Sequence, residues 1–403
     1  MKHIAIFCDG TWQHLDQPHP TNVANLARVT LPRAADGAEQ LVYYDDGVGV
    51  SDGVLDAATH VLGGALGKGL DYKIVRAYEF LALNYDDRDR VFIFGFSRGA
   101  YTARSLAGLI RWAGILKREN AGHAFEAMAI YRTRPAAGAA PAEQAAFEAN
   151  IQAFRERYAH HPHAFVASKA YDAANPASLA PDDDADCGWI QFVGVWDTVG
   201  SLGIPGNLVF ADLLDAQYRF YDTSLSRSVR SARHAVSIDE RRKTFSPALW
   251  GNIGDLNVNA QAEGAPYEQR PYQQRWFPGG HGDVGGGGAD GGISLAPMLW
   301  VAEGATRAGF AFDQAQLDHY AAIANPVAKF VSGGFDLGGF IMELDGVADR
   351  CGPDHFEEVS LAARLRWARI DGYRSPPLKR SAAVMDGLSR WEPSPDPQVY
   401  FQP

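Results

Sequence analysis

The chain has 403 residues, and 46% of them are hydrophobic, enough to bury a large core. Its formal net charge is −11 and no basic tract stands out, so we do not expect nucleic acid as a partner. This acidic balance gives no general attraction to anionic membranes, although a local patch would allow transient contact with a membrane surface.

The N-terminal residues do not read as a signal peptide, because their apolar run is short and is broken by Asp9. No stretch approaches the length of a transmembrane helix. The three cysteines, Cys8, Cys187 and Cys351, are an odd number without a C-x-x-C pair, which is typical of reduced thiols. We therefore expect a cytoplasmic protein, or one exported without a cleaved signal peptide.

The first elements in chain order predict the start of a parallel sheet. Short apolar runs indicate buried strands over residues 4–8 and 41–44. The glycine-rich residues 47–69 indicate a long loop or a broken helix. A helix is predicted from Asp71, as its N-cap, to about Tyr85, with Ile74, Val75, Tyr78 and Leu81 on one face.

Residues 90–110 read as a strand, a sharp turn and a helix. The apolar run 91–94 is followed by Gly95-Phe-Ser-Arg-Gly99, which matches G-x-S-x-G, and helical spacing begins at Ala100. In this context the motif is typical of a nucleophile elbow, where a strained turn lifts the serine hydroxyl clear of the sheet. Ser97 is therefore the candidate nucleophile.

Residues 116–187 depart from this alternation and predict a helical insertion. Helices are expected over about 122–134 and 142–160, followed by an aspartate-rich loop at 182–186. The insertion is either a lid or a helical layer, and we find no separate second domain in residues 1–403.

The remaining elements resume the alternation. Strands are predicted over 189–196 and 274–278, and helices over 226–238, 294–308, 314–324 and 360–369. The fold class is α/β and α/β-hydrolase-like, with a mostly parallel sheet covered by helices on both faces.

A serine nucleophile needs a base and an orienting acid, and in α/β-hydrolases these follow later strands. Asp197 directly follows the strand 189–196, and His281 follows the strand 274–278 in a glycine-rich loop. All three positions would converge on the carboxyl edge of the sheet. Asp222 and Asp283 are alternative acids, and His234, within the predicted helix 226–238, is the alternative histidine.

The backbone N–H of Arg98 is the first expected oxyanion-hole donor, because it follows the nucleophile. A second donor is expected from Gly10 or Thr11, in the turn after the first strand. Asp9 is expected to hold this turn through hydrogen bonds to backbone N–H groups. A phosphoesterase using Asp9 is a weaker alternative, because Phe7 occupies the nucleophile position of the D-x-D-G-T motif.

Several motifs together resemble an α/β-hydrolase family that includes type VI secretion phospholipase effectors. They occur in the family's order at residues 4–12, 95–101, 195–200, 234–242, 276–287 and 369–377. The resemblance implies Ser97 as nucleophile, Asp197 as acid and His281 as base. It also implies phospholipid acyl esters as a substrate class.

Two functions of different classes follow from these observations. The first is a serine hydrolase that cleaves small-molecule or lipid carboxylic esters through an acyl-serine intermediate, without a cofactor or a metal ion. The second is a non-catalytic binding or toxin-associated module that retains the fold. Aromatic side chains near the elbow, Phe96, Tyr101 and Trp12, would suit an acyl chain in the first case.

Overall fold

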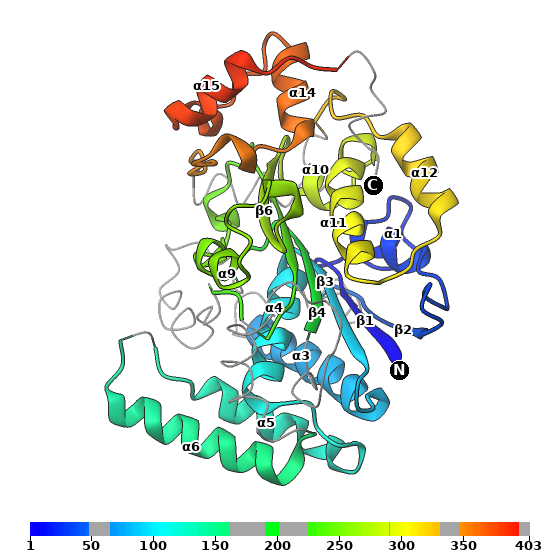
Figure 1. Cartoon of the computed structure of the whole chain (residues 1–403), viewed down its shortest axis with the longest axis vertical. Helices are drawn as coiled ribbons and strands as arrows, with labels where there is room; N and C mark the ends of the chain where they lie inside the picture. The colour runs from blue at the N-terminus through cyan, green and yellow to red at the C-terminus, as the bar shows by residue number, and fades with distance from the viewer. Residues whose placement is uncertain are drawn as a thin grey trace.

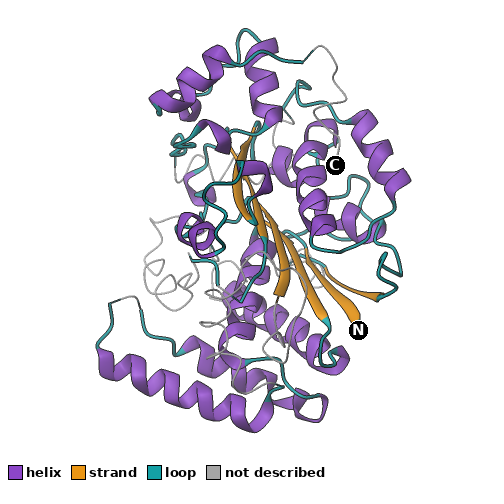
Figure 2. Ribbon diagram, viewed as in Figure 1, coloured by secondary structure: helices purple, strands orange, loops and turns teal. Residues whose placement is uncertain are grey.

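A parallel β-sheet runs through the described part of the chain (Figures 1 and 2). The computed structural model describes residues 1–47, 65–136, 138–160, 190–200, 224–226, 228–289, 291–330 and 346–394. The six strands are β1 (Lys2–Cys8), β2 (Glu39–Asp45), β3 (Arg90–Phe96), β4 (Ile190–Trp196), β5 (Ala232–Ser237) and β6 (Tyr272–Phe277). Their order is β2-β1-β3-β4-β5-β6, so residues that follow β1, β3, β4 and β6 share one edge.

The central strands are the apolar runs that the sequence predicted. In β1, β3 and β4, side chains on both faces are buried, which is why these strands read as continuous hydrophobic segments. Each strand pairs in parallel with its neighbours, as in the register of Ile4 with Val91 and of Phe94 with Gly194. The predicted α/β fold is confirmed.

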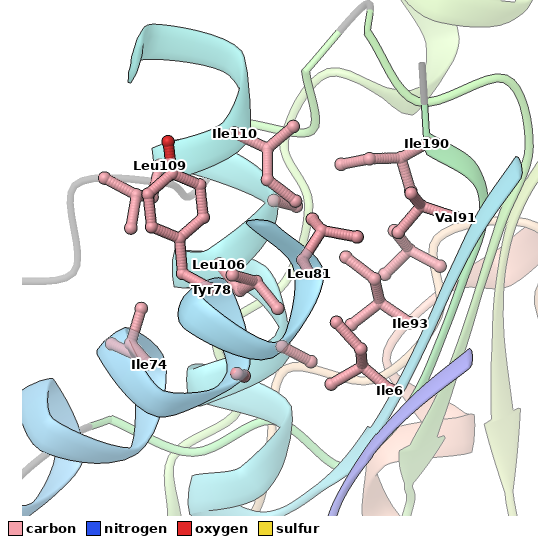
Figure 3. Packing of buried hydrophobic residues seen from close by; sticks show 14 of the residues in the cluster. Ile6, Ile74, Tyr78, Leu81, Val91, Ile93, Leu106, Leu109, Ile110 and Ile190 are labelled. Atoms are coloured by element: carbon pink, nitrogen blue, oxygen red, sulfur yellow. The ribbon is translucent and has the colours of Figure 1, made fainter. Parts of the chain in front are cut away.

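One face of the sheet is covered by α3 (Ala65–Asn84) and α4 (Arg98–Ala113). Figure 3 shows Ile74, Tyr78 and Leu81 of α3 and Leu106, Leu109 and Ile110 of α4 beside Ile6, Val91, Ile93 and Ile190 of the sheet. The predicted apolar face of α3 is buried, but the predicted start was wrong. The helix already begins at Ala65, so Asp71 lies inside it rather than at its N-cap. The Asp71 carboxylate pairs with Arg132.

The other face carries α1 (Asn22–Arg28), α11 (Leu295–Arg307) and α12 (Gln314–Ile323). Aromatic rings fill this layer: Phe94 lies 4.6 Å from Phe7 and 5.9 Å from Phe310, measured between ring centroids. Helices therefore cover both faces, as expected for strands that are apolar on both sides.

A third cluster packs at the β6 end of the sheet. It brings α14 (Leu361–Arg369) and α15 (Ala382–Arg390) together with Trp276 of β6, Leu378 and Val384. Val359 forms a parallel bridge with Trp276, and the N–H of Ser360 donates to the Trp276 carbonyl at 3.0 Å. The C-terminal residues are thus joined to the sheet by main-chain and side-chain contacts.

The helix predicted over 226–238 is wrong, because this segment contains the central strand β5. All six side chains of β5 are buried, including those of Arg233 and His234. Arg233 is accommodated by an ion pair with Glu303 and by its position over the Trp300 ring, both on α11. Pairing with β4 and β6 overrides the local pattern.

The described helices of the insertion pack on α3 and α4. They are the 3-10 helix η1 (Arg118–His123), α5 (Ala124–Arg132) and α6 (Pro141–Tyr158), and their predicted positions are confirmed. In α6, Phe147 contacts Trp112 near the end of α4. Figure 1 shows α5 and α6 at the bottom of the view and α10 (His281–Gly285) in its upper half. A lid role for the insertion stays a prediction.

Some predictions fall outside the described residues: residues 48–64 of the glycine-rich segment 47–69, the aspartates 182–186, Cys187 and Asp222. Cys8 and Cys351 are free thiols. Within the described ranges, no helix combines the length and the apolar character needed to cross a bilayer. The remaining short helices are η3 (Lys243–Phe245), α9 (Ile253–Asn259), η4 (Tyr267–Gln269), η5 (Gly291–Ile293), η6 (Phe356–Glu358) and η7 (Pro376–Lys379).

Candidate active site

Ser97 occupies a sharp turn between β3 and α4. Its φ of 59° and ψ of −122° lie outside the usual regions for a residue with a side chain. Two glycines make the turn sterically feasible. A Cβ atom at Gly95 would lie 2.4 Å from the Gly99 carbonyl oxygen, and one at Gly99 would lie 2.2 Å from the Cys8 carbonyl oxygen. The G-x-S-x-G spacing therefore lets the helix, the strand and the turn after β1 approach one another closely.

Three residues that are distant in sequence meet at this turn. The Nε2 atom of His281 lies 2.7 Å from the Ser97 Oγ, and its Nδ1 atom lies 2.6 Å from Asp197 Oδ2. Their exposed fractions are 5% for Ser97, 8% for His281 and 0% for Asp197, so water has little access to the chain of hydrogen bonds. The arrangement can carry a proton from the hydroxyl to the imidazole.

Each of these side chains is delivered by the end of a strand. Asp197 directly follows β4 and has a positive φ of 37°, a strained conformation for a non-glycine residue. His281 follows β6 after three residues and is the first residue of α10, a short helix where the sequence predicted a loop. Parallel strands explain the convergence, because their carboxyl ends share one edge.

The carboxylate of Asp197 has partners for both oxygens. The Ser237 N–H donates to Oδ1 at 2.9 Å, and Arg350 donates to Oδ1 at 2.5 Å and to Oδ2 at 2.9 Å. Burial alone would raise the pKa of Asp197, but Arg350 and His281 outweigh it and hold the pKa well below its usual range. The carboxylate is therefore ionised in the folded protein.

The His281 ring contacts two phenyl rings. The ring centroid of Phe96 lies 4.7 Å away at a tilt of 33°, and that of Phe245 lies 4.8 Å away, edge on. The His281 backbone N–H donates to Glu240 Oε2 at 3.2 Å. Burial would raise the pKa of Glu240, but its ion pair with Arg242 outweighs this effect and lowers it.

The turn after β1 lies against the start of α4. Asp9 accepts hydrogen bonds from the hydroxyls of Thr21 and Tyr44 and from the N–H of Gly10, so it holds the turn as expected. Burial raises the pKa of Asp9 to about 6, although these three hydrogen bonds oppose the rise. The Gly10 N–H is thus engaged, whereas Thr11 Oγ1 is buried and finds no hydrogen-bond partner among the described residues.

The alternative residues lie in other environments. His234 is buried in β5, where it accepts the Thr198 N–H at 3.3 Å. Burial, with a contribution from Arg104, lowers the pKa of His234 to about 3. Asp283 accepts the Gly280 N–H at 2.8 Å within α10. In the described ranges, no three His, Cys, Asp or Glu side chains gather as metal ligands would.

Sequence reasoning missed Arg350, Glu240 and Phe245. Arg350 lies 153 positions from its partner Asp197, in a segment with no periodic pattern that would place it. Glu240 and Phe245 belong to the segment that was predicted to follow a helix. For Glu240, the one sequence feature that could have indicated a role at the site is its place in the motif at residues 234–242. Tyr101, expected near an acyl chain, is instead buried in the core beside α3.

Comparisons with known proteins give one family and several more distant similarities. The family model described as "T6SS, Phospholipase effector Tle1-like, catalytic domain" matches residues 2–304. An uncharacterized protein of Saccharomyces cerevisiae, YEL023C, is 29% identical over 254 residues, covering 60% of this chain and 32% of the yeast protein. The chain thus spans about a third of that relative.

Two solved structures are also similar. One is an uncharacterized protein from Pseudomonas aeruginosa, with 18% identity, a TM-score of 0.38 and coverage of 77% of this chain and 46% of that chain. The other is the Tle1 effector bound to the VgrG spike of the type 6 secretion system, with 17% identity, a TM-score of 0.34 and coverage of 71% and 51%. Because the family model matches three quarters of the sequence, the chain belongs to the Tle1-like family of type VI secretion phospholipase effectors, as a catalytic domain.

Proposed function

We propose that the chain hydrolyses carboxylic esters of lipids, with phospholipids as the first substrates to test, through an acyl-serine intermediate on Ser97. The observation that carries this proposal is the hydrogen-bonded series from Ser97 through His281 to Asp197, at 2.7 Å and 2.6 Å. Membership in a phospholipase effector family supports hydrolysis of lipids. Substrates of this kind are met at a bilayer surface.

In the first half-reaction, Ser97 Oγ attacks the ester carbonyl carbon while its proton moves to Nε2 of His281. The Asp197 carboxylate fixes the tautomer with a proton on Nδ1 and stabilises the imidazolium. His281 then gives its Nε2 proton to the departing alcohol oxygen as the C–O bond breaks. The acyl group remains on Ser97.

In the second half-reaction, a water molecule attacks the acyl-serine and gives a proton to His281. The carboxylic acid leaves and Ser97 regains its proton from the imidazolium. The oxyanion of both tetrahedral intermediates would be met by the Arg98 N–H at the start of α4. Because the Gly10 N–H is engaged by Asp9, Thr11 is the better second donor.

A fluorophosphonate probe tests the proposal without knowledge of the substrate. We expect covalent labelling at Ser97, abolished by Ser97→Ala and greatly slowed by His281→Ala. Ser105→Ala, in the same helix α4, and His319→Ala, on the exposed side of α12, are the matched controls and should label normally. Labelling that survives Ser97→Ala would contradict the assignment, and a folded wild-type protein without labelling would favour the non-catalytic module.

Substrate class is then resolved with p-nitrophenyl esters of rising chain length, followed by phospholipid vesicles. The proposal expects release of fatty acid from vesicles by the wild-type protein and none by Ser97→Ala. Hydrolysis of short esters alone would restrict the activity to that of a simple esterase.

A further inference from the structure

We propose that Arg350 is a positioning residue of this site, which fixes both the orientation of Asp197 and the charge that His281 experiences. This inference rests on the proposed function. It assigns a role to a residue that lies outside residues 2–304, the range matched by the family model.

The guanidinium of Arg350 meets the carboxylate of Asp197 side by side. Nη1 donates to Oδ1 at 2.5 Å and Nη2 donates to Oδ2 at 2.9 Å. The same two nitrogens donate to the carbonyl oxygens of Ser237 at 2.9 Å and Phe245 at 2.7 Å. Four hydrogen bonds and an exposed fraction of 6% hold the Arg350 guanidinium in one orientation. Its planar two-point contact then fixes the orientation of the Asp197 carboxylate.

The segment that carries Arg350 is itself anchored. Val347 forms an antiparallel bridge with Arg242, and the Ala348 N–H donates to the Arg241 carbonyl at 2.8 Å. Arg241 also pairs with Asp349 at 3.1 Å on the exposed side of the segment. Arg350 therefore enters the site from the C-terminal part of the chain, held by residues that follow β5.

Arg350 changes the charge balance of the site. Asp197 and His281 alone would be an anion at rest and neutral when the imidazole takes the serine proton. With Arg350 the group is neutral at rest and cationic during proton transfer. Because the His281 and Arg350 nitrogens bond the same oxygen at 2.6 Å and 2.9 Å, they lie within about 5.5 Å of each other. At this separation the guanidinium and an imidazolium formed during proton transfer repel each other.

Other charged groups lie on the elements around His281 and are not altered in the Arg350 variants. They are Glu240 with its partner Arg242 after β5, Asp283 on α10, Arg98 on α4 and Asp9 after β1. A change in the rate–pH profile on substitution of Arg350 can therefore be assigned to Arg350, because the other charged groups are the same in every variant.

Two substitutions separate the charge of Arg350 from its geometry. Arg350→Lys keeps the charge but cannot make the two-point contact, and Arg350→Met keeps comparable bulk without the charge. We expect the fluorophosphonate labelling rate of Ser97 to fall about 10–100-fold in both, as for other groups that orient a functional ligand. We expect the acid limb of the rate–pH profile to move up by about 1 pH unit in Arg350→Met only.

The control is Arg241→Met, which removes a guanidinium from the same contact region without touching Asp197. It should label within about 2-fold of the wild-type rate, as expected for an exposed ion pair. Labelling of the wild-type protein is measured first. If it is absent, the proposed function fails; if it is present and both Arg350 variants match it, only this inference fails.

A purely structural role would slow labelling in the variants but would leave the acid limb of the rate–pH profile of Arg350→Met at its wild-type position, and that result overturns the inference. If Arg350→Met does not fold, a double-mutant cycle of Arg350→Lys with Asp197→Asn decides. The inference expects Arg350→Lys to slow labelling in the wild-type background and to add less than about 2-fold in the Asp197→Asn background. Additive losses overturn it.

Discussion

Gly99 is the position where the smallest substitution should have a large effect on the site. A Cβ atom there would lie 2.2 Å from the Cys8 carbonyl oxygen and 2.4 Å from that of Asp9. Ordinary contacts of a carbon atom begin at about 3.5 Å, so Gly99→Ala must separate the elbow and the turn after β1 by about 1 Å. Both neighbours are backbone atoms, which cannot rotate away.

The expected cost to stability is modest, and the expected cost to reactivity is large. Overpacking of this kind costs about 1–3 kcal/mol. A misplacement of about 1 Å in a catalytic site costs about 10²-fold in rate. We therefore expect Gly99→Ala to lower the melting temperature by a few degrees while slowing fluorophosphonate labelling of Ser97 by about two orders of magnitude.

The matched control is Gly254→Ala in α9, where an added Cβ atom meets no other atom within 4 Å. This change should leave labelling unaltered and should not destabilise the protein, because alanine is favoured over glycine in a helix by about 1 kcal/mol. Thermal unfolding and labelling rates at 25 °C are measured for all three proteins. Labelling of Gly99→Ala at the wild-type rate would refute the close-approach argument.

Three further predictions concern charge and packing. Asp197→Asn should lower kcat on a p-nitrophenyl ester by about 10⁴-fold, because an amide favours the wrong imidazole tautomer, whereas exposed Asp318→Asn should not. Asp9 has a folded pKa of about 6 against 3.8 unfolded, so its contribution to stability is complete below pH 3.8 and is lost as pH rises through about 6. As the pH rises from 3.8 to about 6, the melting temperature of the wild-type protein should fall relative to that of Asp9→Asn, by the equivalent of about 3 kcal/mol. Plots of melting temperature against pH that run parallel for the two proteins would contradict this. Leu378→Ala, in the buried cluster at β6, should cost about 2–5 kcal/mol in unfolding free energy, and a loss below 1 kcal/mol would show that the cluster is loosely packed.

Sequence patterns predicted the parts of the fold whose cause is local. The apolar runs of β1, β3 and β4 identify buried parallel strands, and the G-x-S-x-G spacing identifies the turn at Ser97, because each pattern reflects its own backbone requirement. Placing Asp197 and His281 at strand ends also needed only the rule that parallel strands share a carboxyl edge. The structure brings these three residues together.

The missed features depend on contacts between distant segments. Strand β5 contains Arg233 and His234, which are compatible with a central strand only because Glu303, Trp300 and Gln274 satisfy them from neighbouring elements. The pairing of Arg350 with Asp197 leaves no trace in either local sequence. Tertiary context, rather than intrinsic propensity, decided both cases.

The joining of the C-terminal residues to β6 has a consequence for the behaviour of shortened proteins. An outermost strand presents unpaired main-chain donors and acceptors that invite another polypeptide to add to the sheet. Here Val359 and Ser360 occupy part of that boundary beside Trp276, with α14 and α15 packed behind them. A protein truncated after residue 304 would expose β6, and we expect this truncated protein to self-associate in solution.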